Sequence, residues 1–215
     1  MEDVRSNFDL VLKAFLLTIE LFLVSGVLSL VFGTLLAAMR VGPIPVLAKA
    51  AAVYVTLLRN TPLLVVFIFA TFGLPKMDIQ LPFFVKGTLA LTLYTSAFVC
   101  EAVRSGINSV PVGQAEAARA NGLTFTQTMN HVVLPQALRA VVPPLASVMI
   151  ALVKNTSVGA VFGLFEATAR MRFFSNDNAD ARPLIFLTFA LGYVIIVEAI
   201  SAGALTLERR WQVAR

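Results

Sequence analysis

Five long apolar runs constrain the fold of this chain more than any other feature of its sequence. They lie at about residues 14–39, 46–74, 83–103, 140–163 and 183–207. At 1.5 Å of rise per residue, about twenty helical residues cover the roughly 30 Å hydrocarbon core of a bilayer. The runs therefore predict an all-α integral membrane protein with five transmembrane helices, which form a single transmembrane domain over residues 1–215.

The composition supports this prediction and excludes several classes of protein. The chain is 58% hydrophobic and 13% charged, whereas soluble chains are about 45–50% apolar and 25% charged. A soluble enzyme, a DNA-binding module and a disordered tail are excluded. The net charge of +5 is modest, so we expect it to orient the chain in a bilayer rather than to bind nucleic acid.

The first run is predicted to be a retained span rather than a secretory signal. Its flank carries Glu2, Asp3 and Asp9, whereas a signal peptide has a basic flank, and the run exceeds the usual 7–15 residues or so. The single cysteine, Cys100, cannot form an internal disulfide.

The second run is interrupted by the polar sequence Arg59-Asn60-Thr61-Pro62. Either one long helix is kinked at Pro62 or two short pieces re-enter the membrane. We favour the kinked helix, because its first turns carry Lys49 and can project into water.

Lysines and arginines between the spans give a narrow preference for one orientation. With the N-terminus outside, eight of them lie on the inner side and seven on the outer side. The inner set comprises Arg40, Lys49, Arg104, Arg119, Arg139, Arg209, Arg210 and Arg215, and the outer set Arg5, Lys13, Lys76, Lys86, Arg170, Arg172 and Arg182. The positive-inside rule then favours an outer N-terminus and a cytoplasmic C-terminus.

The longest hydrophilic stretch, about residues 104–139, is predicted to form a hairpin of two short helices. Ser109 is a candidate N-cap for the first helix, with Pro111 in its opening turn, and Gly122 stands where a C′ glycine ends a helix. Thr124 and Gln127 have the spacing of a capping box and begin the second helix.

Pro135 is expected to end this second helix. Apolar residues such as Leu123 and Phe125 are scattered through the polar hairpin, and an exposed apolar surface of this kind needs a partner. The alternative is a pair of amphipathic helices in the plane of the lipid headgroups.

The hairpin carries a spaced motif with a family likeness. Glu116-Ala117-Ala118 is followed after three residues by Gly122 and after nine more by Val132-Val133-Leu134-Pro135. This sequence resembles the "EAA" loop of ABC importer permeases, EAA-x3-G-x9-I-x-L-P, with valine in place of isoleucine. The flanking blocks are similar to the polar-amino-acid subfamily, the histidine, glutamate, glutamine and arginine permeases, and look closest to actinobacterial glutamate-uptake permeases. These blocks are Arg59–Leu64, Tyr94–Phe98, Glu101–Ile107, Gly113–Arg119, Leu134–Ala137 and Lys154–Ser157.

The resemblance implies a type I ABC importer permease fold in a bacterial cell (inner) membrane, with the hairpin in the cytoplasm. Its implied partners are an ATP-binding cassette ATPase dimer, a second permease chain (the same or a paralogue), an extracellular or periplasmic amino-acid-binding protein, and the lipid bilayer. The implied ATPase-coupling residues are Glu116, Ala117, Ala118, Gly122, Leu123, Phe125, Leu134 and Pro135.

The sequence contains no G-x-x-x-x-G-K-[ST] phosphate-binding motif. We therefore expect no enzymatic activity and no cofactor in this chain, and we expect ATP and Mg on the separate ATPase. One histidine and one cysteine are too few for a metal cluster or a nucleophile–base pair.

Two cationic regions inside the spans are candidates for substrate binding, because ionisable groups in a membrane usually face a cavity or a partner. Arg59 and Lys154 are expected to line one cavity near the middle of the bilayer and to bind the α-carboxylate and side chain of an amino acid. Under the alternative hypothesis they pair with Glu20, Glu198 or helix carbonyls and only hold the bundle together. The full candidate set is Arg59, Asn60, Thr61, Lys154, Asn155, Thr156 and Ser157.

The function predicted from all of these features is ATP-driven import of a polar amino acid, glutamate or a related acidic or amide amino acid, by alternating access. An ion-coupled secondary transporter or channel that acts without an ATPase is the alternative. Most secondary transporters contain two repeated halves, and five unequal spans argue against that class. An intramembrane enzyme would need a catalytic string such as H-E-x-x-H or G-x-S-x-G, and neither occurs.

Overall fold

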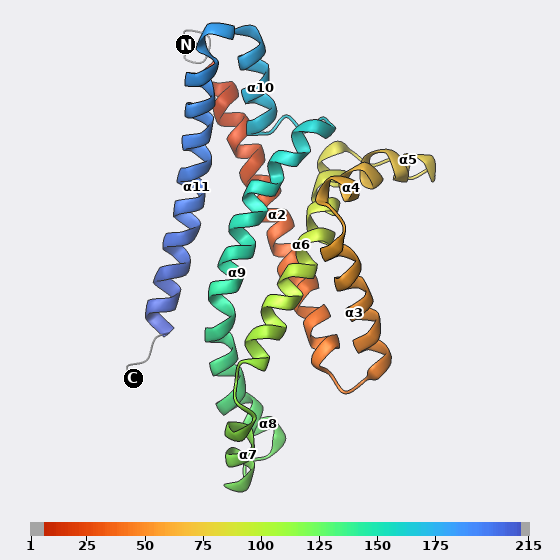
Figure 1. Cartoon of the computed structure of the whole chain (residues 1–215), viewed down its shortest axis with the longest axis vertical. Coiled ribbons are helices and arrows are strands. Elements are labelled where there is room, and N and C mark those ends of the chain that lie inside the picture. The colour runs from red at the N-terminus through yellow and green to blue at the C-terminus, as the bar shows by residue number, and fades with distance from the viewer. Residues whose placement is uncertain (1–6, 212–215) are drawn as a thin grey trace.

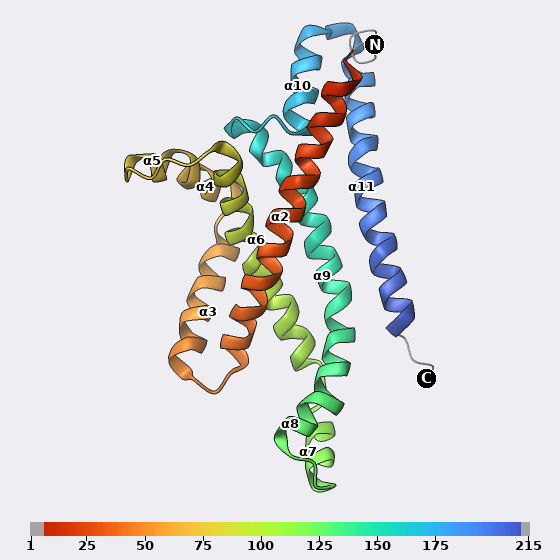
Figure 2. The same cartoon turned by 180° about the vertical axis from the view of Figure 1, so that it is seen from behind.

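The computed structural model describes residues 7–211, and within them the fold is helical, with no β-strand (Figures 1 and 2). The all-α prediction is confirmed. Residues 1–6 and 212–215, which include Arg5 and Arg215 of the charge count, lie outside the described part. The elements in order are α2 (Phe8–Val41), α3 (Pro45–Asn60), α4 (Leu63–Ile68), the π-helix η1 (Phe69–Gly73), α5 (Leu74–Lys76), α6 (Phe83–Asn108), α7 (Val112–Ala120), α8 (Phe125–Thr128), the π-helix η2 (Met129–Val133), α9 (Leu134–Thr156), the 3-10 helix η3 (Ser157–Phe162), α10 (Ala167–Asp177), the 3-10 helix η4 (Ala179–Ala181) and α11 (Arg182–Trp211).

Four continuous helical segments among the described residues are long and apolar enough to cross a membrane. They are Phe8–Val41, Phe83–Asn108, Phe125–Phe162 and Ala179–Arg209, and the pair α3 with α4–α5 makes a fifth span if it is counted as one. The predicted architecture of five transmembrane helices is confirmed in this sense.

The second span does not continue as one kinked helix, so that expectation is wrong. The chain turns by 102° between Asn60 and Leu63, and α4 and α5 run sideways from the bundle (Figures 1 and 2). Thr61 and Pro62 both have extended backbones, with ψ of 130° and 138°. Proline has no N–H to donate and pushes the preceding residue out of the helical region, so the break falls at these two residues.

Helices α2, α6 and α9 form the centre of the bundle, and α11 packs on the outside (Figures 1 and 2). The buried face of α2 is rich in small residues, including Ser25, Ser29, Gly33 and Ala37. A Cβ atom added at Gly33 would lie 2.5 Å from the side chain of Val99. The absence of side-chain bulk is what lets the α2 and α6 backbones approach this closely.

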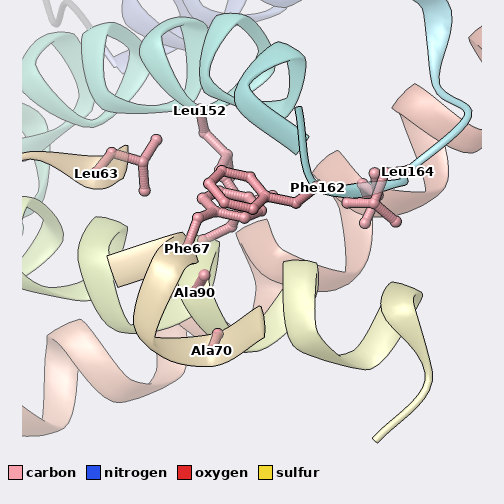
Figure 3. Packing of buried hydrophobic residues seen from close by; sticks show 9 residues of the cluster. Leu63, Phe67, Ala70, Ala90, Leu152, Phe162 and Leu164 are labelled. Atoms are coloured by element: carbon pink, nitrogen blue, oxygen red, sulfur yellow. The ribbon is translucent and has the colours of Figure 1, made fainter. Parts of the chain in front are cut away.

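The main apolar cluster joins the bent second span to α6, α9 and η3 (Figure 3). The rings of Phe67 and Phe162 stack with centroids 5.3 Å apart, and Leu91 and Leu152 are fully buried around them. The cluster fixes α4 against the end of the fourth span, which explains how a segment as short as α4 holds its sideways course.

The fourth span begins inside the hairpin rather than after it. Helices α8, η2, α9 and η3 run without interruption over Phe125–Phe162. Pro135 lies in the first turn of α9, directly after the π-turn Met129–Val133. A proline at this position loses little hydrogen-bond energy through its missing N–H, so the helix continues through it. The expectation that Pro135 ends a separate hairpin helix is therefore wrong.

Candidate functional site

Two features of the fold are candidates for function, namely the hairpin at one end of the molecule and a half-open cavity between two helices of the bundle. The hairpin, built from α7 and α8, projects beyond the other helices at the end opposite α10 (Figures 1 and 2). The cavity lies between α6 and α9.

The turn of the hairpin is held by local hydrogen bonds. Gly122 has φ of +86°, and its N–H donates to the carbonyl of Arg119. Thr124 then caps the next helix: its hydroxyl accepts from the N–H of Gln127, and the Gln127 side chain accepts from the N–H of Thr124. The predicted glycine turn and capping box are both confirmed.

The first hairpin helix starts differently from the prediction. Pro111 is the N-cap of α7, with no side-chain cap bond, and the Ser109 hydroxyl donates instead to the carbonyl of Gly106 at the end of α6. Ser109 therefore ends α6 and does not cap α7. The preceding helix supplies an acceptor that the sequence pattern does not reveal.

The hairpin presents a mixed polar and apolar surface. Glu116 and Ala117 are exposed, as is Phe125 at 70% and Val112 at 72%, while Leu123 is half-buried. The Gln136 side chain, one turn into α9, donates to the Gln114 side chain on α7 at 2.5 Å. This bond ties the two arms of the hairpin together at the point where the span begins.

Of the remaining predicted hairpin residues, Ala118 is half-buried against its neighbours, Leu134 is 38% exposed and Pro135 is half-buried. The hairpin thus combines a fixed turn with uncovered apolar side chains, and it continues directly into a membrane-spanning helix.

The cavity has a volume of about 360 Å³ and is lined by neutral side chains. Thr95 is 3% exposed, and its hydroxyl has no hydrogen-bond partner among the described residues. Tyr94, Ser147 and Asn155 supply further polar atoms. The complete lining is Tyr94, Thr95, Phe98, Ser147, Val148, Ala151 and Asn155.

Lys154 faces a different groove. It lies with Ser157, Thr168 and Tyr193 in a pocket of about 260 Å³ between α9, α10 and α11, whereas its neighbour Asn155 lines the α6–α9 cavity. Within the single chain, the structure does not bring Lys154 and Arg59 into one cavity. Side chains of consecutive helical residues point about 100° apart, so Lys154 faces away from the cavity that Asn155 lines.

Arg59 does not line the cavity but contacts Phe98, which does. Its guanidinium lies 5.6 Å from the centre of the Phe98 ring, and one of its nitrogens is 3.7 Å from the Glu101 carboxylate. Arg40 and Arg104 also pair with Glu101. The alternative hypothesis, in which Arg59 has an ionic partner, is right about the pairing but wrong about the residue, because Glu20 and Glu198 are exposed and the partner is Glu101.

The other predicted site residues lie outside the cavity. Asn60 is exposed, the Thr61 hydroxyl donates to the carbonyl of Leu57, and the buried Thr156 hydroxyl donates to the carbonyl of Val153. The hydroxyls of Thr61 and Thr156 therefore donate to backbone carbonyls of their own helices rather than toward the cavity.

Sequence reasoning missed two carboxylates, Glu101 and Glu166. Glu166 is fully buried and accepts hydrogen bonds from the N–H groups of Thr168 and Ala169 and from the Tyr193 hydroxyl. The N-cap position of Glu166 on α10 is a local signal in the sequence. For Glu101 only Arg104 is a local partner, whereas Arg40 and Arg59 lie on two other helices. Among residues 7–211, no group of acidic, histidine or cysteine side chains has an arrangement suited to a metal ion.

A bundle of five membrane spans with a projecting helical hairpin, together with an uncharged, mainly apolar cavity between two of its central helices, defines the membrane-spanning subunit of a transporter. The chain belongs to the family of binding-protein-dependent transport system inner membrane components, which its residues 29–212 match.

Individual relatives are similar over nearly the whole chain. The glutamate transport system permease protein GluC of Corynebacterium efficiens is 39% identical over 204 residues, covering 89% of this chain and 90% of the relative. The probable glutamine ABC transporter permease protein GlnP of Bacillus subtilis is 39% identical over 198 residues, covering 91% of each. The glutamate/aspartate import permease protein GltJ of Escherichia coli K12 is 33% identical, covering 92% of this chain and 85% of the relative.

Solved structures share the fold. A crystal structure of an amino acid ABC transporter with histidines superposes with a TM-score of 0.89 at 27% identity, covering 97% of both chains. The MetNI methionine ABC transporter in an inward-facing conformation has a TM-score of 0.76 at 22% identity, covering 97% of this chain and 99% of that one. The predicted type I ABC importer permease fold is confirmed.

Proposed function

We propose that this chain is the membrane-spanning subunit of an ATP-driven importer for a polar amino acid, with glutamate or a related acidic or amide amino acid as substrate. The observation that carries the proposal is the continuous helix Phe125–Phe162, which joins the hairpin to the cavity. The hairpin residue Phe125 and the cavity residue Ser147 lie on this one helix, twenty-two positions apart, or about 33 Å at 1.5 Å per residue.

This continuity gives coupling a mechanical basis. A partner that closes around the exposed apolar side chains of the hairpin moves the start of the helix, and the cavity wall on α9 moves with it. Such rigid-body displacement of packed helices is a common way to convert a distant binding event into a change at a site. The chain supplies the lever, and ATP and Mg²⁺ are held by a separate ATPase dimer.

The residues proposed to dock on that ATPase are those of the hairpin motif. Glu116, Ala117 and Phe125 are exposed there, and Gly122 sets the angle between the two arms. Leu123, Leu134 and Pro135, with Ala118, are half-buried or lie at the base, so we assign them to holding the shape of the hairpin.

The cavity between α6 and α9 is the proposed substrate site. Its volume lies within the range of small-ligand pockets, about 300–1,000 Å³. Neutral hydroxyl and amide groups suit a zwitterion, and Thr95 adds a hydroxyl that is buried in the cavity wall and has no partner among the described residues. The names of the relatives, which include glutamate and glutamine permeases, support an acidic or amide amino acid.

Two copies of the permease, identical or paralogous, are proposed to form the working unit with the ATPase dimer. An amino-acid-binding protein on the outer side would deliver the substrate. The hairpin end is assigned to the cytoplasm and the α10 end to the outside, in agreement with the narrow excess of inner basic residues.

Transport by the reconstituted complex tests this function. We expect proteoliposomes that contain the permease, its ATPase and the binding protein to take up labelled glutamate or glutamine only when ATP is supplied. Uptake that runs without ATP and follows an imposed ion gradient would support the secondary-transporter alternative instead.

Thr95 provides the sharper test of the site. Thr95→Val keeps the shape and removes the hydroxyl, so we expect substrate affinity to fall about five- to tenfold, the equivalent of one hydrogen bond of ~1 kcal/mol. Thr92→Val is the matched control, since Thr92 lies on the same helix, is buried, and has an unpaired hydroxyl outside the cavity. Equal losses in the two variants would remove Thr95 from the site.

A further inference from the structure

One carboxylate on α6 holds three arginines from three different helices. Glu101 pairs with Arg40 from the end of α2, with Arg59 from the last turn of α3, and with Arg104 one turn further along α6 at 2.8 Å. The Glu101 side chain is only 19% exposed. An ion cluster that joins separate elements at a partly buried position favours one relative placement of them, more strongly through Arg40, which is 21% exposed, than through Arg59, which is 45% exposed.

The cluster lies directly beside the proposed substrate cavity. Phe98 lines the cavity and precedes Glu101 by three residues, so both lie on the same side of α6. The Arg59 guanidinium rests over the Phe98 ring, and the other neighbour of this ring is Tyr94, whose centroid is 5.0 Å away. Phe98 therefore contacts both a cation that does not line the cavity and an aromatic side chain that does.

Arg59 also lies at the point where the second span breaks. It is the penultimate residue of α3, and the chain turns by 102° immediately after Asn60. Glu101 thus links the end of α3, just before the break, to α6, which forms one wall of the cavity.

We propose that Glu101 and Arg59 are positioning residues for the substrate cavity: Glu101 fixes the Arg59 guanidinium on Phe98, and this contact sets the orientation of the ring that forms the cavity wall. The inference rests on the proposed function of the cavity as the substrate site. It replaces direct binding of the substrate by Arg59, since Arg59 is not among the residues that line the cavity. Arg104, which belongs to the same cluster but does not contact Phe98 or join another helix, has no such role.

This difference within the cluster supplies the control. In the reconstituted complex we expect Arg59→Gln to raise the KM for labelled glutamate roughly two- to tenfold, the range of a partly desolvated cation–π contact, with a smaller effect on kcat. Arg59→Lys keeps a cation over the ring and should restore part of the affinity. Arg104→Gln removes a partner of the same carboxylate and should leave KM within about twofold of the wild type.

A double-mutant cycle tests whether Arg59 acts through Phe98. In a Phe98→Leu background, Arg59→Gln should change KM no further, because the contact is already absent. Additive effects would overturn the proposal. So would an Arg104→Gln variant that raises KM as much as Arg59→Gln, or variants whose uptake falls only in proportion to their membrane yield. The cycle does not depend on Glu101→Gln, which leaves three arginines unopposed.

A second measurement separates failure of this inference from failure of the proposed function. With Trp211→Phe to remove the one native tryptophan, Phe98→Trp places a fluorescent reporter at the cavity wall. Adding Arg59→Gln should shift its emission and increase its quenching by acrylamide, whereas Arg104→Gln should do neither. An unchanged signal would overturn the positioning role even in a complex that transports normally. A wild-type complex that imports no amino acid would refute the proposed function and leave the fluorescence result standing as a test of the contact.

Discussion

Glu166 is a carboxyl group buried at the junction of three helices. It caps α10 by accepting the N–H groups of Thr168 and Ala169, each at 3.0 Å, and it accepts the Tyr193 hydroxyl of α11 at 2.6 Å. The Thr18 hydroxyl of α2 accepts the N–H of Ala167 in the same place. One side chain therefore organises the end of the bundle opposite the hairpin, in the stretch of chain between the spans Phe125–Phe162 and Ala179–Arg209.

The ionisation of Glu166 should make the stability of this end depend on pH. Burial raises the pKa of its carboxyl above the ordinary value of 4.5. The folded chain then holds the proton more tightly than the unfolded chain, so this contribution to stability is complete below the ordinary pKa and is lost as the pH rises through the raised pKa. We expect the Tm of the wild type to exceed that of Glu166→Gln by a margin that shrinks with increasing pH.

Thermal unfolding of the detergent-solubilised complex from about pH 5 to pH 8 measures this margin. A Glu166→Gln margin that grows with pH would show that the hydrogen bonds to the carboxylate outweigh its burial.

At the scale of single residues, the sequence predicted features whose causes are local. Gly122 and the Thr124–Gln127 pair were identified correctly because their partners lie within a few positions. For Glu101 only the pairing with Arg104, three positions on, is local in this sense, whereas Arg40 and Arg59 are 61 and 42 positions away and reach it only through packing. The ionic partner of Arg59 was therefore assigned to the wrong carboxylates.

The hairpin turn is an element whose geometry depends on one residue. Gly122→Ala places a Cβ at φ of +86°, which costs about 1–2 kcal/mol and favours a different angle between α7 and α8. Gly113→Ala is a matched control, since a Cβ at either position meets no atom within 4 Å but only Gly122 has a positive φ. We expect both variants to insert normally, while Gly122→Ala alone loses ATPase co-purification and uptake. Equal ATPase co-purification and equal uptake in the two variants would contradict coupling through the hairpin.

The crossing of α2 and α6 depends on Gly33. A Cβ there would lie 2.5 Å from Val99 and 2.8 Å from the backbone oxygen of Ser96, and the backbone cannot yield cheaply. Gly33→Ala should destabilise the fold by about 1–3 kcal/mol through overpacking. Gly203→Ala, also inside a long helix but with no atom within 4 Å, should be neutral or slightly stabilising. Resistance to proteolysis in membranes distinguishes these outcomes.

At the scale of elements, prolines were the main source of error. The sequence placed a kink at Pro62 and a helix end at Pro135, yet the structure breaks the helix at the first and continues through the second. Both prolines lack an N–H, and the difference in outcome comes from the backbone conformation that precedes each of them. A π-turn precedes Pro135, whereas Thr61 before Pro62 is extended and α4 is drawn sideways onto Phe162.

At the scale of the whole molecule, the sequence predicted the number of spans and the projecting hairpin but not the composition of the cavity. Arg59 and Lys154 were placed together because each lies deep in an apolar run. The rotation of α9 turns Lys154 toward α11 and its neighbour Asn155 toward α6. Depth in the bilayer can be estimated from a sequence by counting residues, whereas the direction in which a side chain points depends on packing.

The orientation of the molecule in the membrane is the last property to test, and the chain is well suited to it. Its one cysteine, Cys100, is fully buried, so labelling of introduced cysteines can be measured with little labelling of the native one. Thr126 in the hairpin and Asn176 in α10 are both exposed and lie at opposite ends of the bundle (Figures 1 and 2). In intact spheroplasts, a membrane-impermeant maleimide should label Asn176→Cys and should leave Thr126→Cys unlabelled until the membrane is permeabilised. The two sites must respond oppositely, because the continuous span Phe125–Phe162 separates them. The reverse pattern would place the hairpin outside, where no ATPase could engage it, and would refute the proposed coupling together with the positive-inside assignment.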